Sequence, residues 1–283
     1  MKSAERLAII HSLTMSSARE LERALPSPSR RDANMEASTS LARADGRTPN
    51  QLRPLFGDAG ALTRADGSAR WRQDRTEVLV AVHGPCEVRR NRERVDGAYV
   101  EVLVRPRAGL PGPPERELEQ LLGATLRAAI ITSLHPRTAI SIVVQVIADD
   151  GALLSAALNG ATLALLHAAI PMRGPAVGCT IALLPSGAAL LDPTADEERD
   201  AAAVVTLGYL LRDLQGLGAE RQLLLSHARG TVGEARFDAC RAAAQRAGAA
   251  VVAFLREAMV PRVAPLPALD EMEGLADALA EGR

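Results

Sequence analysis

The stretch LHPRTAISIVVQVIADDGALLSAALNGATLALLHAAIP, residues 134–171, decides the fold of this chain. Its β-branched run at residues 140–147 is typical of a buried strand. The acidic turn at residues 149–151 ends that run, and residues 152–169 are then rich in Ala and Leu and contain no proline. This composition predicts a helix that is apolar on most of its surface. The sequence therefore predicts a strand, a tight turn and a helix at the centre of the core.

The turn at residues 149–151 is also the first candidate site. The N-terminus of a helix offers free backbone N–H groups and the positive end of the helix dipole, which together favour an anion. A phosphate-using enzyme would bind phosphate here. Residues 152–171 are apolar enough to suggest a membrane span as well, but Asn159 and His167 interrupt them and no basic flank follows closely. A buried core helix is therefore the prediction.

The composition limits the kinds of protein that this chain can be. Of 283 residues, 47% are hydrophobic and only 2% aromatic, so the predicted core is large and aliphatic. The 33 basic and 34 acidic residues nearly cancel, which excludes a globally basic nucleic-acid binder but not a local basic surface. Cys86, Cys179 and Cys240 lie far apart, and the five histidines show no metal-ligand spacing. We expect no metal and no cofactor, a reducing compartment, and cysteines that are buried as small hydrophobic residues.

The remaining strands and helices follow a repeated order. Residues 61–85 predict a β-hairpin that turns at Asp74-Arg75. Further strands are predicted at residues 98–105, 176–184, 188–191, 201–210 and 221–228, and further helices from about residue 115 and at residues 234–260. Strands in hairpins are thus followed by helices twice. This order favours an α+β fold of two similar β-hairpin/helix halves packed together.

Three segments divide the chain. Residues 1–40 form an N-terminal extension that is predicted to be partly helical or disordered, because helical spacing gives way to Ser, Pro and Arg. Residues 41–260 form the predicted domain. Residues 261–283 contain proline and are acidic, so they predict a loose tail. Met35 lies just before the domain and is a candidate start, or alternative start, of the protein.

Several motifs carry a resemblance to a known family. They are RADGRTPNQLRP at residues 43–54, DGSA at 66–69, GLPG at 109–112, LHPRT at 134–138 and LDPT at 191–194. With these motifs the chain resembles the RNase PH family, whose fold occurs in phosphorolytic exoribonucleases and in the hexameric ring of the RNA exosome. The resemblance implies an RNase PH-like domain at residues 41–260. It also implies that Arg47 and Arg53 bind backbone and neighbouring subunits; an ordered arm with solvated charges is the alternative.

The central turn departs from the pattern of the active enzymes. Those enzymes carry DGGTRTA, in which hydroxyl and Arg side chains hold phosphate, whereas residues 150–156 here are DGALLSA. Leu153 stands where a hydroxyl belongs, Leu154 stands where the arginine belongs, and Ser155 follows. Leucine cannot hold phosphate. The resemblance therefore implies a degenerate phosphate site at these three positions.

The acidic positions depart from the pattern too. Active family members supply two aspartates after the LDPT-like residues, which act with a divalent cation or as general acid. The matching positions hold Arg199 and Val204. Asp192, within LDPT itself, is predicted to be structural, and the acidic residues within 196–200 form a charge run that predicts a solvated face. Loss of both the phosphate arginine and the acids implies that the chain is not an enzyme.

The resemblance implies that the chain acts instead as one part of an assembled ring. A non-catalytic, structural subunit would sit among six ring subunits and three cap proteins and would pair with an inactive member similar to exosome component eight. Such a ring threads single-stranded RNA to a separate hydrolytic nuclease and so supports 3′-to-5′ RNA processing and degradation, including rRNA maturation. The implied location is the nucleus, the nucleolus and the cytoplasm.

Four arginines are the candidate RNA contacts. Arg89, Arg90, Arg92 and Arg94 lie in a loop that faces the RNA channel in related ring subunits; a solvated charged loop is the alternative. Two other functions stay open. One is an active phosphate-dependent 3′-exoribonuclease of the RNase PH type, and the other is a scaffold outside the exosome.

Overall fold

A computed structural model describes residues 43–211 and 221–260 of the chain. The predicted extension at residues 1–40, the candidate start at Met35 and the predicted tail at residues 261–283 lie outside these ranges, so they stay predictions. The chain divides into two compact units, residues 1–48 and residues 49–283. The described part of the first unit is a short turn in which Arg47 forms an ion pair with Asp45 at 2.5 Å. The described strands and helices all belong to the second unit.

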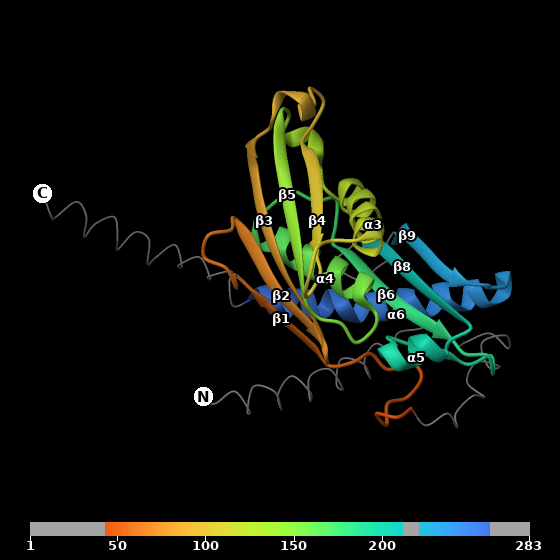
Figure 1. Ribbon diagram of the computed structural model, residues 1–283. Helices are drawn as coiled ribbons and strands as arrows, with labels where there is room; N and C mark the ends of the chain where they lie inside the picture. The colour runs from red at the N-terminus through yellow and green to blue at the C-terminus, as the bar shows by residue number, and fades with distance from the viewer. Residues whose placement is uncertain (1–42, 212–220, 261–283) are drawn as a thin grey trace, which may run out of the picture. The chain divides into compact units, whose positions relative to one another are not determined.

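The first part of this unit forms a five-stranded sheet in the order β1-β2-β3-β5-β4 (Figure 1). The strands are β1 (Leu55–Ala59), β2 (Gly67–Gln73), β3 (Thr76–Glu87), β4 (Tyr99–Arg105) and β5 (Thr138–Ala148). All neighbouring strands run antiparallel except β4 and β5, which run parallel and are joined through helix α3 (Pro113–Ala129). The hairpin pattern of the sequence did not predict this parallel crossover, which makes the two halves unequal.

The second part forms a four-stranded antiparallel sheet in the order β7-β6-β8-β9. Its strands are β6 (Ala176–Leu183), β7 (Ala189–Leu191), β8 (Ala203–Leu211) and β9 (Arg221–Gly230). The remaining elements are the short helix α5 (Ala195–Asp200), the long helix α6 (Glu234–Met259) and two 3₁₀ turns, η1 (Arg90–Arg92) and η2 (Thr132–Leu134). The predicted α+β class is confirmed.

Helix α4 (Leu153–His167) is the centre of the core, as the sequence predicts. It contacts β2 and β3 of the first sheet and β6 and β8 of the second, so it lies between the two sheets. Every residue from 154 to 165 is buried. Its leucines Leu158, Leu163 and Leu165 are fully buried, and burial of each contributes about 1.5–3 kcal/mol.

The polar side chains of α4 are satisfied within this core. The amide of Asn159 donates to Gly178 O at 3.1 Å and accepts from Gly178 N at 2.8 Å, and the hydroxyl of Thr162 donates to Ala176 O. Both partners lie on β6, so these bonds fix the register of the helix against the second sheet. Among the described residues, no helix is long and apolar enough to cross a membrane.

One prediction about the cysteines is wrong. Cys179 and Cys240 are buried, as predicted, and burial raises the pKa of the Cys179 thiol to about 12. Cys86 is exposed instead. It lies near the end of β3, where the sequence at residues 83–87 is HGPCE and four of these five residues are exposed, so the alternating apolar run of the strand no longer continues there.

Candidate phosphate and acid site at the start of α4

A buried arginine holds the turn before α4 in place. Arg53 donates to Asp150 O at 2.8 Å, to Gly151 O at 3.1 Å and to Asp192 Oδ1 at 2.7 Å. Both Arg53 and Asp192 are only 2% exposed. The hydroxyl of Thr76 also donates to Gly151 O, at 2.8 Å. Arg53 therefore binds backbone within its own chain, and Asp192 takes part in a structural ion pair.

The turn itself needs a glycine at its centre. Gly151 has a φ of 82°, and a Cβ there would lie 2.7 Å from the backbone carbon of Thr194. The following residue, Ala152, is also left-handed with a φ of 54°. The turn therefore packs directly against the LDPT segment, which brings the predicted phosphate region beside α5. Sequence separation of more than forty residues hides this contact from local patterns.

The three predicted phosphate positions lie in the first turn of α4 but present no group for phosphate. Leu153 is half-buried and Leu154 is buried. The hydroxyl of Ser155 donates to Ala152 O at 2.8 Å and accepts from the hydroxyl of Thr180 at 3.2 Å, in a fully buried position. Its hydrogen-bonding capacity is thus used inside the core. No side chain of this first turn can replace the missing arginine.

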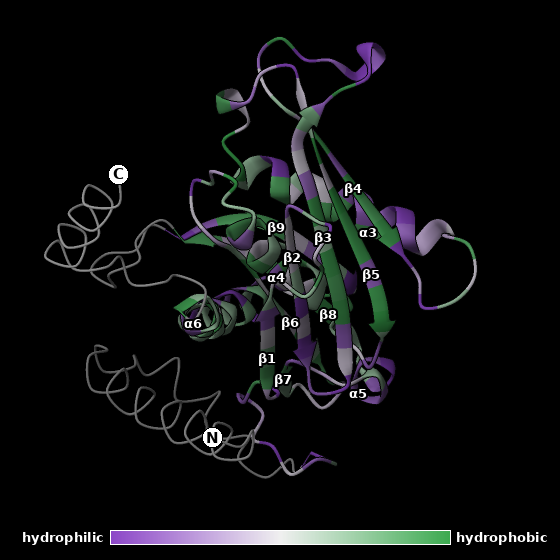
Figure 2. Ribbon diagram, turned by 90° about the vertical axis from the view of Figure 1, so that its left-hand side faces the viewer, coloured by the Kyte–Doolittle hydropathy of each residue, from purple (hydrophilic) through white to green (hydrophobic). Residues whose placement is uncertain are grey.

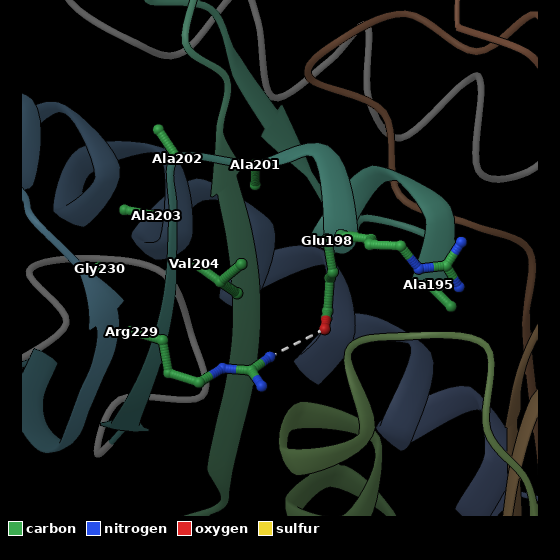
Figure 3. A pocket seen from close by; sticks show the side chains of 9 residues that line it. Ala195, Glu198, Ala201, Ala202, Ala203, Val204, Arg229 and Gly230 are labelled. Carbon is green, nitrogen blue, oxygen red and sulfur yellow. Dashed lines mark hydrogen bonds and ion pairs between the residues drawn. The ribbon is translucent and has the colours of Figure 1, made fainter.

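The backbone N–H group at the start of α4 already donates a hydrogen bond to a carboxylate of the same chain. Ala152 N donates to Glu198 Oε1 at 2.6 Å, and Arg229 on β9 donates to Glu198 Oε2 at 3.1 Å (Figure 3). The Glu198 side chain is 17% exposed. The prediction that the acidic residues within 196–200 all form a solvated face is therefore wrong for Glu198. Its carboxylate takes the place that an external anion would take at this amide.

The local sequence explains why Glu198 faces inward. Thr194 caps α5: its hydroxyl accepts from Glu197 N at 3.4 Å, and the Glu197 carboxylate accepts from Thr194 N at 2.9 Å. This capping box sets the phase of the helix, so the side chains of Glu198 and Arg199 point in different directions. Arg199 pairs with Asp196 at 3.0 Å, and its side chain is 75% exposed. The Thr-x-x-Glu pattern at 194–197 was the signal that could have identified Glu198.

Glu198 and Val204 share a pocket of about 400 Å³. The pocket is lined by residues of α5, of the α5–β8 connection and of the ends of β8 and β9: Ala195, Glu198, Arg199, Ala201, Ala202, Ala203, Val204, Arg229 and Gly230 (Figure 3). The structure therefore brings the two predicted acid positions, Arg199 and Val204, to one place. Glu198 supplies the one carboxylate in the lining.

The four predicted RNA-binding arginines lie elsewhere. Their loop is at the far end of β3 and β4, whereas α5 and the pocket lie at the opposite end of the sheet (Figures 1 and 2). Arg92 forms an ion pair with Glu101 and lies 5.4 Å from the ring centre of Tyr99, and Arg94 pairs with Asp96 at 3.0 Å. Arg89 and Arg90 are exposed and form no ion pair within the described ranges. Two of the four cations are thus already neutralised locally.

Comparisons with known proteins agree with this fold. The sequence pattern of the 3′ exoribonuclease family, domain 1, called RNase_PH, matches residues 51–171. The exosome complex exonuclease RRP46 homolog of Arabidopsis thaliana is 40% identical over 169 residues, which are 60% of this chain and 71% of that protein. The human exosome complex component RRP41 is 37% identical over 179 residues, 59% of this chain and 73% of that protein.

Solved structures give the same result. The crystal structure of rice (Oryza sativa) Rrp46 superposes with a TM-score of 0.71 at 36% identity, covering 76% of this chain and 98% of that one. The exosome of Archaeoglobus fulgidus with RNA bound to the active site matches with a TM-score of 0.63 at 21% identity, covering 80% of this chain and 96% of that one. The second likeness concerns the fold alone.

Proposed function

The chain belongs to the RNase PH family of 3′ exoribonucleases, and from that premise we propose that it is a non-catalytic ring subunit of a eukaryotic RNA exosome. In this role it pairs with other ring subunits, among them an inactive one similar to exosome component eight, and contacts cap proteins. The ring threads single-stranded RNA to a separate hydrolytic nuclease for rRNA maturation and RNA turnover in the nucleus, the nucleolus and the cytoplasm. The motifs GLPG and LHPRT favour the branch known as exosome component five.

The observation that carries the non-catalytic assignment is Val204. Phosphorolysis needs inorganic phosphate held beside the terminal phosphodiester and an acid or a bound cation that stabilises the leaving oxygen. The methyl groups of Val204 line the pocket where the family supplies a carboxylate, and they can neither donate a proton nor hold a cation. Independently, Leu154 stands where the family has its phosphate-binding arginine. The carboxylate of Glu198 also already accepts the hydrogen bond of the backbone N–H at the turn.

The test is a phosphorolysis assay on the full chain and on the assembled ring. Single-stranded RNA is incubated with phosphate and Mg²⁺, and release of nucleoside diphosphates is measured. We expect none above background from this subunit, with an active RNase PH enzyme as the positive control. Phosphate-dependent release that disappears with Glu198→Gln would contradict the proposal and would identify Glu198 as the acid.

That outcome defines the second candidate function, an active phosphate-dependent 3′-exoribonuclease. Glu198 favours it, because one carboxylate remains at the pocket and is positioned beside the start of α4. The Arabidopsis relative is also named as an exosome complex exonuclease. The two candidates differ in a single measurable quantity, the phosphate-dependent release of nucleoside diphosphates.

Ring membership is tested separately. The tagged full chain is expressed in its native cell and recovered at physiological salt, and the co-purifying proteins are identified by mass spectrometry. We expect other RNase PH-like subunits and cap proteins in stoichiometric amounts. Recovery of the chain alone, or with unrelated proteins only, would favour a scaffold outside the exosome.

A further inference from the structure

The backbone of Arg137 has a conformation that arginine rarely adopts. This residue is the fourth of the motif LHPRT, residues 134–138. Its φ is 58°, in the left-handed region that glycine and asparagine enter most easily. In other residues the Cβ atom then lies too close to the following carbonyl oxygen, which is unfavourable. A residue held in this conformation is a candidate functional residue.

Two segments that are distant in the sequence pack against each other at this residue. Arg137 N donates to Arg94 O at 3.0 Å, and Ala98 N donates to Thr132 O at 2.9 Å. Residues 132–138 therefore form one surface with the loop that carries the four candidate RNA-binding arginines. This surface lies at the end of the sheet where β3 ends and where β4 and β5 begin (Figure 1).

The side chain of Arg137 is not needed for these backbone contacts. Its Nε atom lies 3.5 Å from Glu93 Oε1, and the two side chains are 67% and 36% exposed. An ion pair this exposed contributes little to stability. Glycine could make the same backbone hydrogen bond and would adopt the left-handed conformation at no steric cost. Contacts within the chain therefore do not explain why an arginine occupies this position.

A phosphate ligand does explain the arginine. A guanidinium group is always charged, and its planar fork of N–H donors matches two oxygens of a phosphate group. On the adjoining loop, Arg89 and Arg90 are exposed and form no ion pair within the described ranges. We propose that Arg137 contacts the phosphodiester backbone of single-stranded RNA, and that residues 132–138 complete an RNA-contacting surface that begins with Arg89 and Arg90.

This surface recognises phosphate rather than bases. Tyr99, at the start of β4, is half-buried, and Arg92 lies over its ring at 5.4 Å from the centre. That ring is not free to stack on a base, and Leu134, which is 60% exposed, is aliphatic and cannot stack either. The inference rests on the proposed function, in which RNA passes this end of the subunit.

The test measures RNA affinity and stability in the same variants. Arg137→Gly removes the cation and relieves the left-handed backbone, whereas Arg137→Lys keeps a positive charge. The matched control is Arg246→Ala, which removes one exposed arginine from α6, a helix that packs on β1, β6 and β8. Assembled rings that contain each variant are titrated with single-stranded RNA over a range of salt concentrations, and thermal unfolding of each full chain is measured.

We expect RNA affinity and stability to separate in Arg137→Gly. The slope of log affinity against log salt should fall by about 0.7, with all sequences weakened equally, because one phosphate contact is lost. The variant should nevertheless unfold at the temperature of the parent or above it, because glycine suits the left-handed conformation. Arg137→Lys and Arg246→Ala should both keep the slope of the parent.

Four outcomes would overturn the inference. An unchanged slope in Arg137→Gly, while Arg89→Ala with Arg90→Ala lowers it, would do so and leave the proposed function standing. Unchanged slopes in both would show that RNA does not pass this end of the subunit. A lower slope accompanied by a lower unfolding temperature would make the role of Arg137 structural. Loss of a ring protein from the Arg137→Gly assembly, detected by mass spectrometry, would assign this surface to a protein contact.

Discussion

At the scale of single residues, the Arg53–Asp192 pair is the strongest determinant of the site. Removing one member of a buried ion pair leaves the other charge without its partner and costs about 3–5 kcal/mol. We expect Arg53→Ala to lower the free energy of unfolding by this amount in urea denaturation. The matched control is Arg70→Ala. The Arg70 side chain, which pairs with Glu77, is 51% exposed, so this variant should lose at most about 1 kcal/mol of unfolding free energy. Equal losses would contradict the structural role of Arg53.

The cysteines give a second prediction at this scale. Burial raises the pKa of Cys179 to about 12 and also raises the pKa of Cys240. A raised pKa means that both thiols stay protonated at pH 8, where only a thiolate reacts rapidly. A colorimetric thiol reagent at pH 8 should therefore titrate one fast thiol, Cys86, in the native protein and three after denaturation. Two fast thiols in the native protein would show that one of the buried positions opens.

The residues of the site were only partly predictable. Leu154 and Val204 could be identified from sequence, because the absence of a charged group is a property of the residue itself. Glu198 could not, since its direction depends on the phase of α5 and on the long-range contact between the Gly151 turn and Thr194. The Arg53–Asp192 pair spans 139 positions, which no local pattern detects.

At the scale of elements, close packing of β2 on α4 gives a prediction. A Cβ at Gly67 would lie 2.5 Å from Ala164 O, which is backbone and cannot move away without displacing the helix. Gly67→Ala should therefore destabilise the fold by about 1–3 kcal/mol or more. The matched control is Gly233→Ala, where a Cβ would meet nothing within 4 Å.

Thermal unfolding of both variants checks this. Gly233 is the N-cap residue of α6, where alanine is less favourable than glycine, so the control should lose at most about 1 kcal/mol. If Gly67→Ala unfolds at the temperature of the control, β2 and α4 do not pack as closely as described.

Most elements were predictable from sequence, but their pairing was not. Strand β5 and helix α4 follow from β-branched composition and from an unbroken Ala/Leu run. The parallel pairing of β4 with β5 did not follow, because alternating apolar residues identify a strand and not its neighbour. Cys86 was placed wrongly for another reason: a cysteine is most often buried, but its neighbours at residues 83–87, HGPCE, lack the apolar alternation of the buried part of β3.

At the scale of the whole molecule, the loop at residues 89–94 contains two pairs of arginines whose contributions to RNA binding can be measured separately. Phosphate contacts on single strands each contribute about 0.7 to the slope of log affinity against log salt. If Arg89 and Arg90 face RNA in the assembled ring, replacing both by Ala should lower that slope by about 1.4 and weaken all sequences equally. Replacing Arg92 and Arg94 should have a smaller effect, because Glu101 and Asp96 already neutralise them.

The measurement is the affinity of assembled rings for single-stranded RNA over a range of salt concentrations. The Arg92, Arg94 variant is the matched control, with equal loss of charge in the same loop. Equal changes in slope for both pairs would mean that the local ion pairs open on binding. If neither variant changes the slope, the loop is solvated and does not contact RNA.

The position of α4 between the two sheets has a consequence for how the protein folds. The family pattern ends at residue 171, just after this helix, yet the helix carries Asn159 and Thr162, whose hydrogen-bond partners lie beyond that boundary on β6. A fragment cut at residue 171 would expose those polar groups and the leucines that α4 shares with the second sheet. The sequence-family boundary is therefore not a folding boundary, and the two sheets should form and melt together in one cooperative transition.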